Sequence, residues 1–273
     1  MLRIAAIDFL NAAPLMWGLE ADPRFRLRHS LPSECADALR AGTADLGVIP
    51  VIELARIPGL VGLEGLGVAS CDAGGEAADV RSILLISRCP LAQVKTLALD
   101  RASRTSVVLA QILLRHRFGA AFATVACGSD WRRALDTADA VLLIGDPALR
   151  LRVNGGAEEF AVHDLARIWH DWTGLPFVFA LWGIRAPVWD DNRDWLRARL
   201  TQALDAAQVE RRKLVTFWST RLALPPSEVR HYLSCNVAHR LGPRHQEGWQ
   251  RFFDLAAQDG LIPAAALPPL VAA

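Results

Sequence analysis

The sequence has little net charge and few lysines. Its 273 residues include 30 basic and 29 acidic residues, so the formal net charge at pH 7 is only +1. A nucleic-acid-binding protein normally carries a basic face, and the charge balance therefore gives no electrostatic argument for a nucleic-acid partner. Lys95 and Lys213 are the only lysines, which a genomic bias toward arginine explains as easily as function does.

Long apolar runs are also absent from the sequence. No apolar stretch approaches the roughly 20 residues that a membrane-spanning helix needs, so we expect no membrane partner. The chain begins with a short strand-like run at residues 3–7, without the apolar segment and cleavage site of a secretory signal. We therefore expect the protein to be cytoplasmic.

The cysteines and histidines show no metal-binding or disulfide pattern. The five cysteines are odd in number, are scattered, and form no C-x-x-C pair, which favours free thiols in a reducing compartment. Of the seven histidines, His163 and His170 would lie two helical turns apart, but neither has a second candidate ligand nearby. The sequence predicts no metal site and no cofactor.

The length and the alternation of apolar runs predict two lobes. Strand-like runs at residues 4–7, 25–29 and 46–49 alternate with helix-like segments, and the alternation restarts after residue 94. This pattern is typical of an α/β fold with mostly parallel sheets flanked by helices. We expect one lobe to contain residues 1–88 and 177–273, including a helical C-terminal tail, and the second to contain residues 89–176. The chain would then pass between the lobes twice, and a cleft would lie between them.

A hydroxyl-rich loop runs directly into an apolar helix at residues 99–114. Ser103 is placed as an N-cap, and Thr105 and Ser106 would stand beside the remaining free N–H groups, with Arg104 between them. A helix start carries partial positive charge and unpaired donors. We favour a seat for a carboxylate or another small anion over the alternative, which is ordinary capping of the helix.

Two further turns place polar residues after strands. Asn11 lies between a strand and the helix that Pro14 begins, where it can bind a ligand or cap the helix. Gly145 and Asp146 follow the strand at residues 140–144, and ligands of open α/β sheets gather at such strand ends. For Asp146, ligand binding and helix capping are equally supported.

Six segments, taken together and in order, resemble a known family. They read D-F-L-N-A-A-P-L at 8–15, P-S-E-C-A-D-A-L-R-A-G-T-A-D-L-G-V-I-P at 32–50, V-R-S-I-L-L-I-S at 80–87, L-D-R-A-S-R-T-S at 99–106, L-L-I-G-D at 142–146 and W-T-G-L-P-F-V-F-A at 172–180. The chain is similar to the chorismate dehydratases of the futalosine route to menaquinone. The resemblance implies a periplasmic-binding-protein type II fold used as a hydro-lyase, which eliminates water from chorismate to give 3-[(1-carboxyvinyl)oxy]benzoate.

The resemblance implies a site for a dicarboxylate. We expect catalytic roles for Asn11, Ser82 and Asp146, and substrate contacts from Ser33, Arg81, Ser103, Arg104, Thr105, Ser106 and Gly145. The matching segments contain no histidine and no paired carboxylates. We therefore hypothesise that the substrate's own enolpyruvyl carboxylate removes the ring proton and that the protein acts mainly by positioning; Asp146 is the alternative base. The rival function is a non-catalytic cytoplasmic binding protein for a small carboxylate.

Two features depart from the family pattern. The loop at residues 71–79 is longer than expected, which affects one edge of the cleft. In the tail, His239 and Arg240 stand where the family usually has tyrosine and aspartate before Leu-Gly. The sequence does not indicate an oligomeric state.

Overall fold

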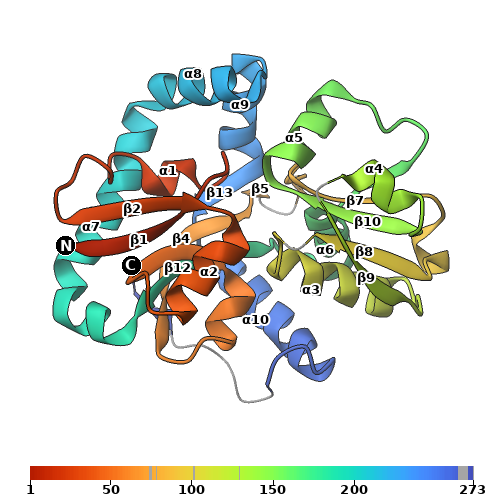
Figure 1. Cartoon of the computed structure of the whole chain (residues 1–273), viewed down its shortest axis with the longest axis horizontal. Coiled ribbons are helices and arrows are strands. Elements are labelled where there is room, and N and C mark those ends of the chain that lie inside the picture. The colour runs from red at the N-terminus through yellow and green to blue at the C-terminus, as the bar shows by residue number, and fades with distance from the viewer. Residues whose placement is uncertain (74–75, 78, 101, 129, 264–269, 273) are drawn as a thin grey trace.

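The computed structural model describes residues 1–73, 76–77, 79–100, 102–128, 130–263 and 270–272. These residues form two lobes, each built on its own β-sheet, and the two sheets lie side by side in Figure 1. The chain crosses from the first lobe to the second after β4 and returns just before β12. Both crossings border the cleft, so the cleft is lined by segments that lie far apart in the sequence.

The first sheet has the spatial order β13-β4-β12-β3-β1-β2, with β14 also paired with β4. All five residues of β3 are buried, as expected for a central strand covered on both faces. The described strands of this sheet are β1 (Leu2–Ile7), β2 (Phe25–Ser30), β3 (Leu46–Pro50), β4 (Leu60–Ser70), β12 (Val178–Arg185), β13 (Val237–Arg240) and β14 (Leu270–Val271).

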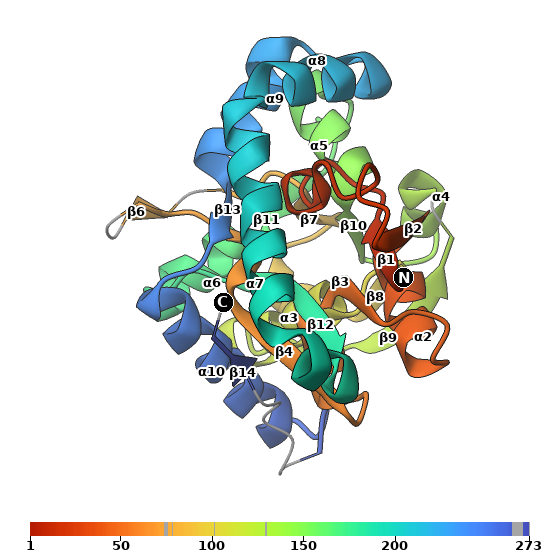
Figure 2. The same cartoon turned by 90° about the vertical axis from the view of Figure 1, so that its left-hand side faces the viewer.

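Helices cover both faces of the first sheet, and Figure 2 shows the long α7 lying across it. In α2, Pro32 occupies the first turn and the Glu34 carboxylate accepts a hydrogen bond from the N–H of Leu31 at 3.1 Å, which fixes the start of the helix. The helical segments of this lobe are α1 (Ala13–Met16), α2 (Pro32–Arg40), the 3₁₀ turn η1 (Val51–Ala55), α7 (Ala186–Val209), α8 (Arg211–Leu222), α9 (Pro226–His231), the π-turn η4 (Tyr232–Asn236) and α10 (Pro243–Gln258).

The second sheet has the order β11-β7-β10-β8-β9. Its strand β7 alternates: Leu84 and Ile86 pack into a small outer core, while Ile83 and Leu85 join the main core. The strands are β7 (Ile83–Ser87), β8 (Thr96–Asp100), β9 (Ala123–Cys127), β10 (Ala140–Ile144) and β11 (Ala161–Asp164), and the helical segments are η2 (Leu91–Gln93), α3 (Thr105–Ile112), the π-turn η3 (Leu113–Arg117), α4 (Trp131–Leu135), α5 (Gly145–Asn154) and α6 (Leu165–Thr173).

The structure corrects the first lobe boundary. β7 pairs with β10 and β11 of the second sheet, so the crossing lies before residue 83 and the expected division after residue 88 is wrong. The second crossing lies between α6 and β12. The sheets are also mixed rather than mostly parallel, because β7 and β12 run antiparallel to their neighbours. The chain enters β7 from the first lobe and β12 from the second lobe. Neither strand therefore needs the crossover helix that connects parallel neighbours within one sheet.

The expected helical tail is more varied than predicted. Its first part consists of two helices, α7 and α8, separated at Glu210, whose ψ of 21° leaves the helical region. β13 and β14 return the tail to the first sheet. In the loop at residues 71–79, β5 (Asp72–Ala73) pairs antiparallel with β6 (Glu76–Ala77); residues 74, 75 and 78 lie outside the described residues.

Candidate functional site

A narrow cavity of about 40 Å³ lies between the two lobes. Space of this size holds only a few water molecules, so the lobes stand close together. Both lobes line it, and its lining combines polar residues with aromatic and aliphatic ones. Its residues are Ile7, Phe9, Asn11, Pro32, Pro50, Val68, Ile83, Ser103, Arg104, Thr105, Ser106, Ile144, Gly145, Phe179 and Ala180.

The start of α3 contributes the polar side of the cavity. Ser103, Thr105 and Ser106 are all buried there. The helix begins at Thr105, its N-cap position is Arg104, and no side chain caps it. The prediction of Ser103 as the N-cap is therefore wrong; residue 101 of this loop lies outside the described residues. The first N–H groups of α3 have no carbonyl partner inside the helix, and they and the hydroxyls together offer donors suited to an anion.

The Arg104 side chain is held by the opposite lobe. Its Nη1 lies 2.8 Å from Oε2 of Glu53, and its Nη2 lies 2.8 Å from both carboxylate oxygens of Asp37. Beside it, Thr105 Oγ1 accepts a hydrogen bond from the N–H of Ile52 at 3.4 Å. The guanidinium expected to bind substrate thus makes its ion pairs across the cleft.

Asp146 fixes the loop that carries Asn11. Its Oδ1 accepts a hydrogen bond from the N–H of Leu10 at 3.0 Å, across the cleft. The carboxyl is buried, and desolvation raises the pKa of Asp146 to about 6. Asp146 is not among the residues that line the cavity, so the described geometry gives it a positioning contact.

His239 holds the same loop from the tail, a role that the sequence did not suggest. Its Nε2 lies 2.7 Å from the backbone carbonyl of Asn11, and since a carbonyl only accepts, Nε2 carries the proton and donates. Burial lowers the pKa of His239 to about 4, so the ring is neutral at pH 7. The neighbouring Arg240 pairs with Asp205 on α7. In the sequence, the only indication that residue 239 has a special role is that histidine stands where the family usually has tyrosine.

Arg81 and Ser82 face the tail rather than the cavity. Arg81 adopts a φ of 60°, its N–H donates to Asp164 Oδ2 at 2.6 Å, and its guanidinium pairs with Glu228 at 2.8 Å. The hydroxyl oxygen of Ser82 lies 2.7 Å from that of Tyr232, and both residues are buried. Burial raises the pKa of Tyr232, so its phenol stays protonated.

Gly145 allows the two lobes to approach. Its φ is 68°, and a Cβ at this position would come within 2.6–2.8 Å of the Phe9 ring. Only glycine fits both the backbone conformation and the contact. Phe9, in the loop after β1, and Phe179, in β12, also line the cavity. Sequence analysis missed both, because aromatic residues next to apolar runs usually belong to the core.

The cavity therefore contains six of the ten expected site residues: Asn11, Ser103, Arg104, Thr105, Ser106 and Gly145. Asp146 and Ser82 do not line the cavity but contact residues beside it or in it: Asp146 accepts from the N–H of Leu10, next to Asn11, and the backbone carbonyl of Ser82 accepts from the N–H of Gly145 at 2.8 Å. Ser33 is buried in the first turn of α2, where its neighbour Pro32 reaches the cavity instead. The functional roles of all ten residues stay predictions.

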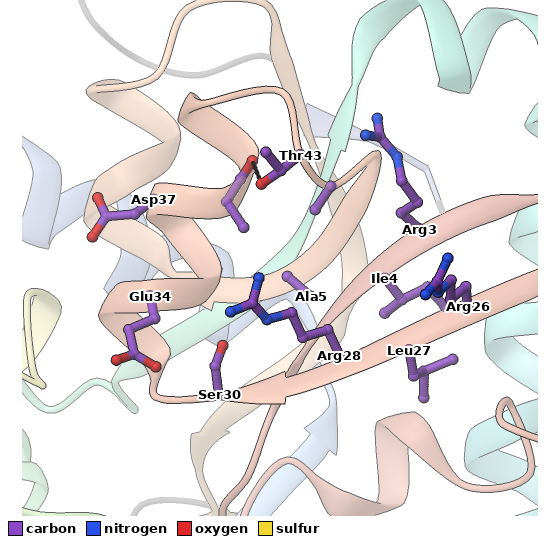
Figure 3. A pocket seen from close by; sticks show the side chains of 12 residues that line it. Arg3, Ile4, Ala5, Arg26, Leu27, Arg28, Ser30, Glu34, Asp37 and Thr43 are labelled. Atoms are coloured by element: carbon purple, nitrogen blue, oxygen red, sulfur yellow. Dashed lines mark hydrogen bonds between the residues drawn. The ribbon is translucent and has the colours of Figure 1, made fainter.

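A larger cavity of about 710 Å³ lies on the outer side of the first lobe, between α2 and the edge strand β2 (Figure 3). Its cationic side chains do not converge on one point. Arg3 is paired with Asp45 at 2.6 Å, and Arg26 is exposed. The cleft, to which both lobes contribute, is the better candidate for a small-molecule site.

Two other classes of site find no support in the described part of the chain. No group of three or more His, Cys, Asp or Glu side chains is placed to hold a metal ion there. Likewise, no described helix combines the length and the apolar character needed to cross a membrane.

Two α/β lobes with a site at their boundary define a periplasmic-binding-protein-like fold. A crystal structure of an Archaeoglobus fulgidus protein matches with a TM-score of 0.75 at 14% identity, covering 96% of this chain and 98% of that one. The alkanesulfonate-binding protein SsuA of Xanthomonas axonopodis pv. citri, bound to MOPS, matches with a TM-score of 0.68 at 17% identity, covering 100% and 98%. These similarities confirm the expected fold class.

The sequence comparisons identify the family. The profile of the menaquinone biosynthesis family matches residues 2–258, and the chain belongs to that family. A curated relative, the chorismate dehydratase of Thermus thermophilus, is 28% identical over 248 residues, which cover 82% of this chain and 84% of the relative. The family expected from the six sequence segments is confirmed.

Proposed function

We propose that this protein is a chorismate dehydratase, a cytoplasmic hydro-lyase that converts chorismate to 3-[(1-carboxyvinyl)oxy]benzoate and water. Membership of the menaquinone biosynthesis family and the similarity to the Thermus thermophilus enzyme support this reaction. The observation that carries the proposal is the cavity itself, which is lined both by the hydroxyl-bearing start of α3 and by apolar side chains.

The donor side of the cavity suits one carboxylate of chorismate. Ser103, Thr105 and Ser106 each supply a hydroxyl, and the helix start adds backbone N–H groups and partial positive charge. Hydrogen bonds from neutral donors to a carboxylate contribute about 1.5–3 kcal/mol each. The cavity of about 40 Å³ is smaller than chorismate, so in this proposal the lobes stand farther apart when the substrate enters, and its ring packs against the side chains of Phe9 and Phe179.

The lining of the cavity favours a substrate-assisted reaction. Arg104 is the only ionisable residue among the described residues that line it, and its guanidinium is paired with Glu53 and Asp37. No carboxylate, histidine or thiol in that set stands ready to remove a proton. The base in our proposal is therefore the enolpyruvyl carboxylate of the substrate, which the sequence analysis favoured.

In this reaction the enolpyruvyl carboxylate takes the proton from C3, and the electron pair of the C–H bond forms the new ring double bond as the C4–O bond breaks. The departing hydroxyl takes up that proton and leaves as water, so the carboxylate is restored and the ring is aromatic. Aromatisation supplies the driving force. Holding the reactive conformer is the enzyme's main task, and well-oriented intramolecular groups reach effective molarities of about 10⁵–10⁸ M.

The remaining expected residues assist this positioning. Asn11 lines the cavity, which supports the proposed role of orienting the enolpyruvyl side chain or the C4 hydroxyl. Asp146 fixes the Asn11 loop through Leu10, at 3.0 Å from its N–H. Asp146→Asn keeps an oxygen acceptor for this N–H, so turnover should persist. Loss of turnover with chorismate still bound would instead identify Asp146 as a protein base.

The direct test is to incubate the purified protein with chorismate and follow the reaction by proton NMR. We expect aromatic signals to replace the ring-diene signals as product forms. The double variant Ser103→Ala/Ser106→Ala should raise KM about a hundredfold or more, since the loss of two donors to a charged group costs about 3 kcal/mol or more. Thr220→Val on the exposed surface of α8 is the matched control and should behave as wild type. Saturable chorismate binding with an unchanged spectrum would favour the rival function, a non-catalytic carboxylate-binding protein.

A further inference from the structure

Glu53 is a buried carboxylate at the edge of the cleft. It belongs to η1, directly after β3, and its side chain is only 1% exposed. Three arginines surround it: Arg40, Arg56 at 3.1 Å, and Arg104 at 2.8 Å. A buried charged group is tolerated when it is paired in this way, so the three ion pairs offset the cost of burying this carboxylate.

The three arginines do not come from the same lobe. Arg40 and Arg56 flank Glu53 within the first lobe, on α2 and just after η1, whereas Arg104 reaches it from the second lobe. Arg104 also contacts both oxygens of Asp37 on α2 at 2.8 Å. Because Arg40 and Arg56 belong to the same lobe as Glu53, the carboxylate keeps two ion-pair partners when the lobes separate and Arg104 moves away. The pair with Arg104 can therefore form and break as the lobes close and open.

Arg104 connects this ion-pair cluster to the start of α3, the proposed binding site for a carboxylate. It lies in sequence between Ser103 and Thr105, and its backbone is the N-cap position of α3. Neither Glu53 nor Asp37 lines the cavity between the lobes. Asp37 instead borders the outer cavity of Figure 3. Arg104, which does line the cavity, connects these two carboxylates to it through their ion pairs.

We propose that Glu53, together with Asp37, is a positioning residue of the site: it holds Arg104 across the cleft and thereby sets the hydroxyl-bearing start of α3 against the first lobe. This inference rests on the proposed function, since it assigns the positioning to the chorismate site. The contact of Thr105 Oγ1 with the N–H of Ile52 at 3.4 Å forms beside the ion pairs and depends on the same closure.

The test measures kcat and KM for chorismate in Glu53→Gln, Asp37→Asn and Arg104→Gln. Each should raise KM about tenfold with kcat within about twofold, a size typical of coupling between sites. Arg104→Lys, which keeps the charge, should recover part of the loss. The double variant Glu53→Gln/Arg104→Gln should be no worse than Arg104→Gln, because both changes remove the same contact.

Arg40→Gln is the matched control, since Arg40 pairs with the same two carboxylates from within the first lobe. It should leave KM unchanged. A purely structural role for Glu53 would lower the melting temperature and the active fraction without moving KM, and that result would overturn the proposal. If Glu53→Gln fails to fold, Asp37→Asn decides the question, because Asp37 is exposed and its replacement should not disturb folding; an unchanged KM in that variant would also refute the proposal.

Small-angle X-ray scattering separates this inference from the proposed function. Without ligand, Glu53→Gln and Arg104→Gln should show a larger radius of gyration than wild type and Arg40→Gln, because the lobes lose an ion pair that joins them. Absence of chorismate turnover by the wild type would refute the proposed function alone. Equal radii of gyration in all four proteins would refute the positioning role of Glu53.

Discussion

Gly145 offers a sharp test of how the cleft is assembled. Replacing it by alanine places a methyl group 2.6–2.8 Å from three atoms of the Phe9 ring and forces a residue with a Cβ to adopt a φ of 68°. Gly174, which ends α6, has nearly the same φ of 71°, but no atom lies within 4 Å of the position that a methyl group would take there. The two substitutions share the backbone strain and differ in the contact with Phe9.

The two contributions have different sizes. A non-glycine residue in the left-handed region costs about 1–2 kcal/mol, so Gly174→Ala should lower the free energy of unfolding by about that amount. Gly145→Ala adds overpacking, which typically costs about 1–3 kcal/mol. Because the contacted atoms are the far end of the Phe9 side chain, part of this cost is relieved when the ring turns into the cavity.

Equilibrium urea unfolding and steady-state kinetics check this reasoning together. Gly145→Ala should lose more stability than Gly174→Ala and should raise KM for chorismate, since the displaced Phe9 ring occupies substrate space. Gly174→Ala should keep the wild-type KM. If Gly145→Ala and Gly174→Ala lost the same stability and Gly145→Ala kept the wild-type KM, the close contact between Gly145 and Phe9 would not be the reason for a glycine at this position.

Three further predictions concern buried polar groups. Desolvation raises the pKa of Asp146 to about 6. The folded state therefore binds this proton more tightly than the unfolded state does. Urea titrations should show that the unfolding free energy of wild type, relative to Asp146→Asn, falls as pH rises from 4 to 6. Burial lowers the pKa of His239 to about 4, and the stability of wild type relative to His239→Gln should fall in the opposite direction, as pH drops from 6.5 to 4. Tyr232→Phe removes the 2.7 Å contact with Ser82 and should cost about 1–2 kcal/mol of unfolding free energy; an unchanged melting curve would contradict that contact.

Local chemistry explains what the sequence predicted well. Pro14 and Pro32 sit in the first turns of α1 and α2, where proline is favoured, and the run after Thr105 is helical as its apolar character indicates. Hydroxyls clustered before that run stood out because more of them were present than a cap needs. The same local reasoning placed Asn11 and Gly145 at strand ends, and both line the cavity.

Long-range pairing explains what the sequence did not predict. Nothing in residues 80–87 indicates that β7 joins the second sheet, because buried strands of either lobe have the same composition. The short β13 was hidden within a helical tail, yet it places His239 against Asn11, 228 positions away in sequence. Arg81 looked like a ligand for a carboxylate, but Asp164 and Glu228 hold its backbone and side chain. An isolated sequence does not specify which acid will meet which arginine.

Several contacts that join the lobes explain why closure and substrate positioning belong together. Asp146 accepts from Leu10, Thr105 accepts from Ile52, and Arg104 meets Glu53. Each contact involves a residue that carries the site or is directly adjacent in sequence to one that does. Opening the cleft therefore separates the Asn11 loop from the start of α3, and closing it restores both at once. In the proposed reaction, such a site needs no ionisable catalytic side chain in its lining, because bringing the lobes together around one conformer of the substrate would itself provide the catalysis.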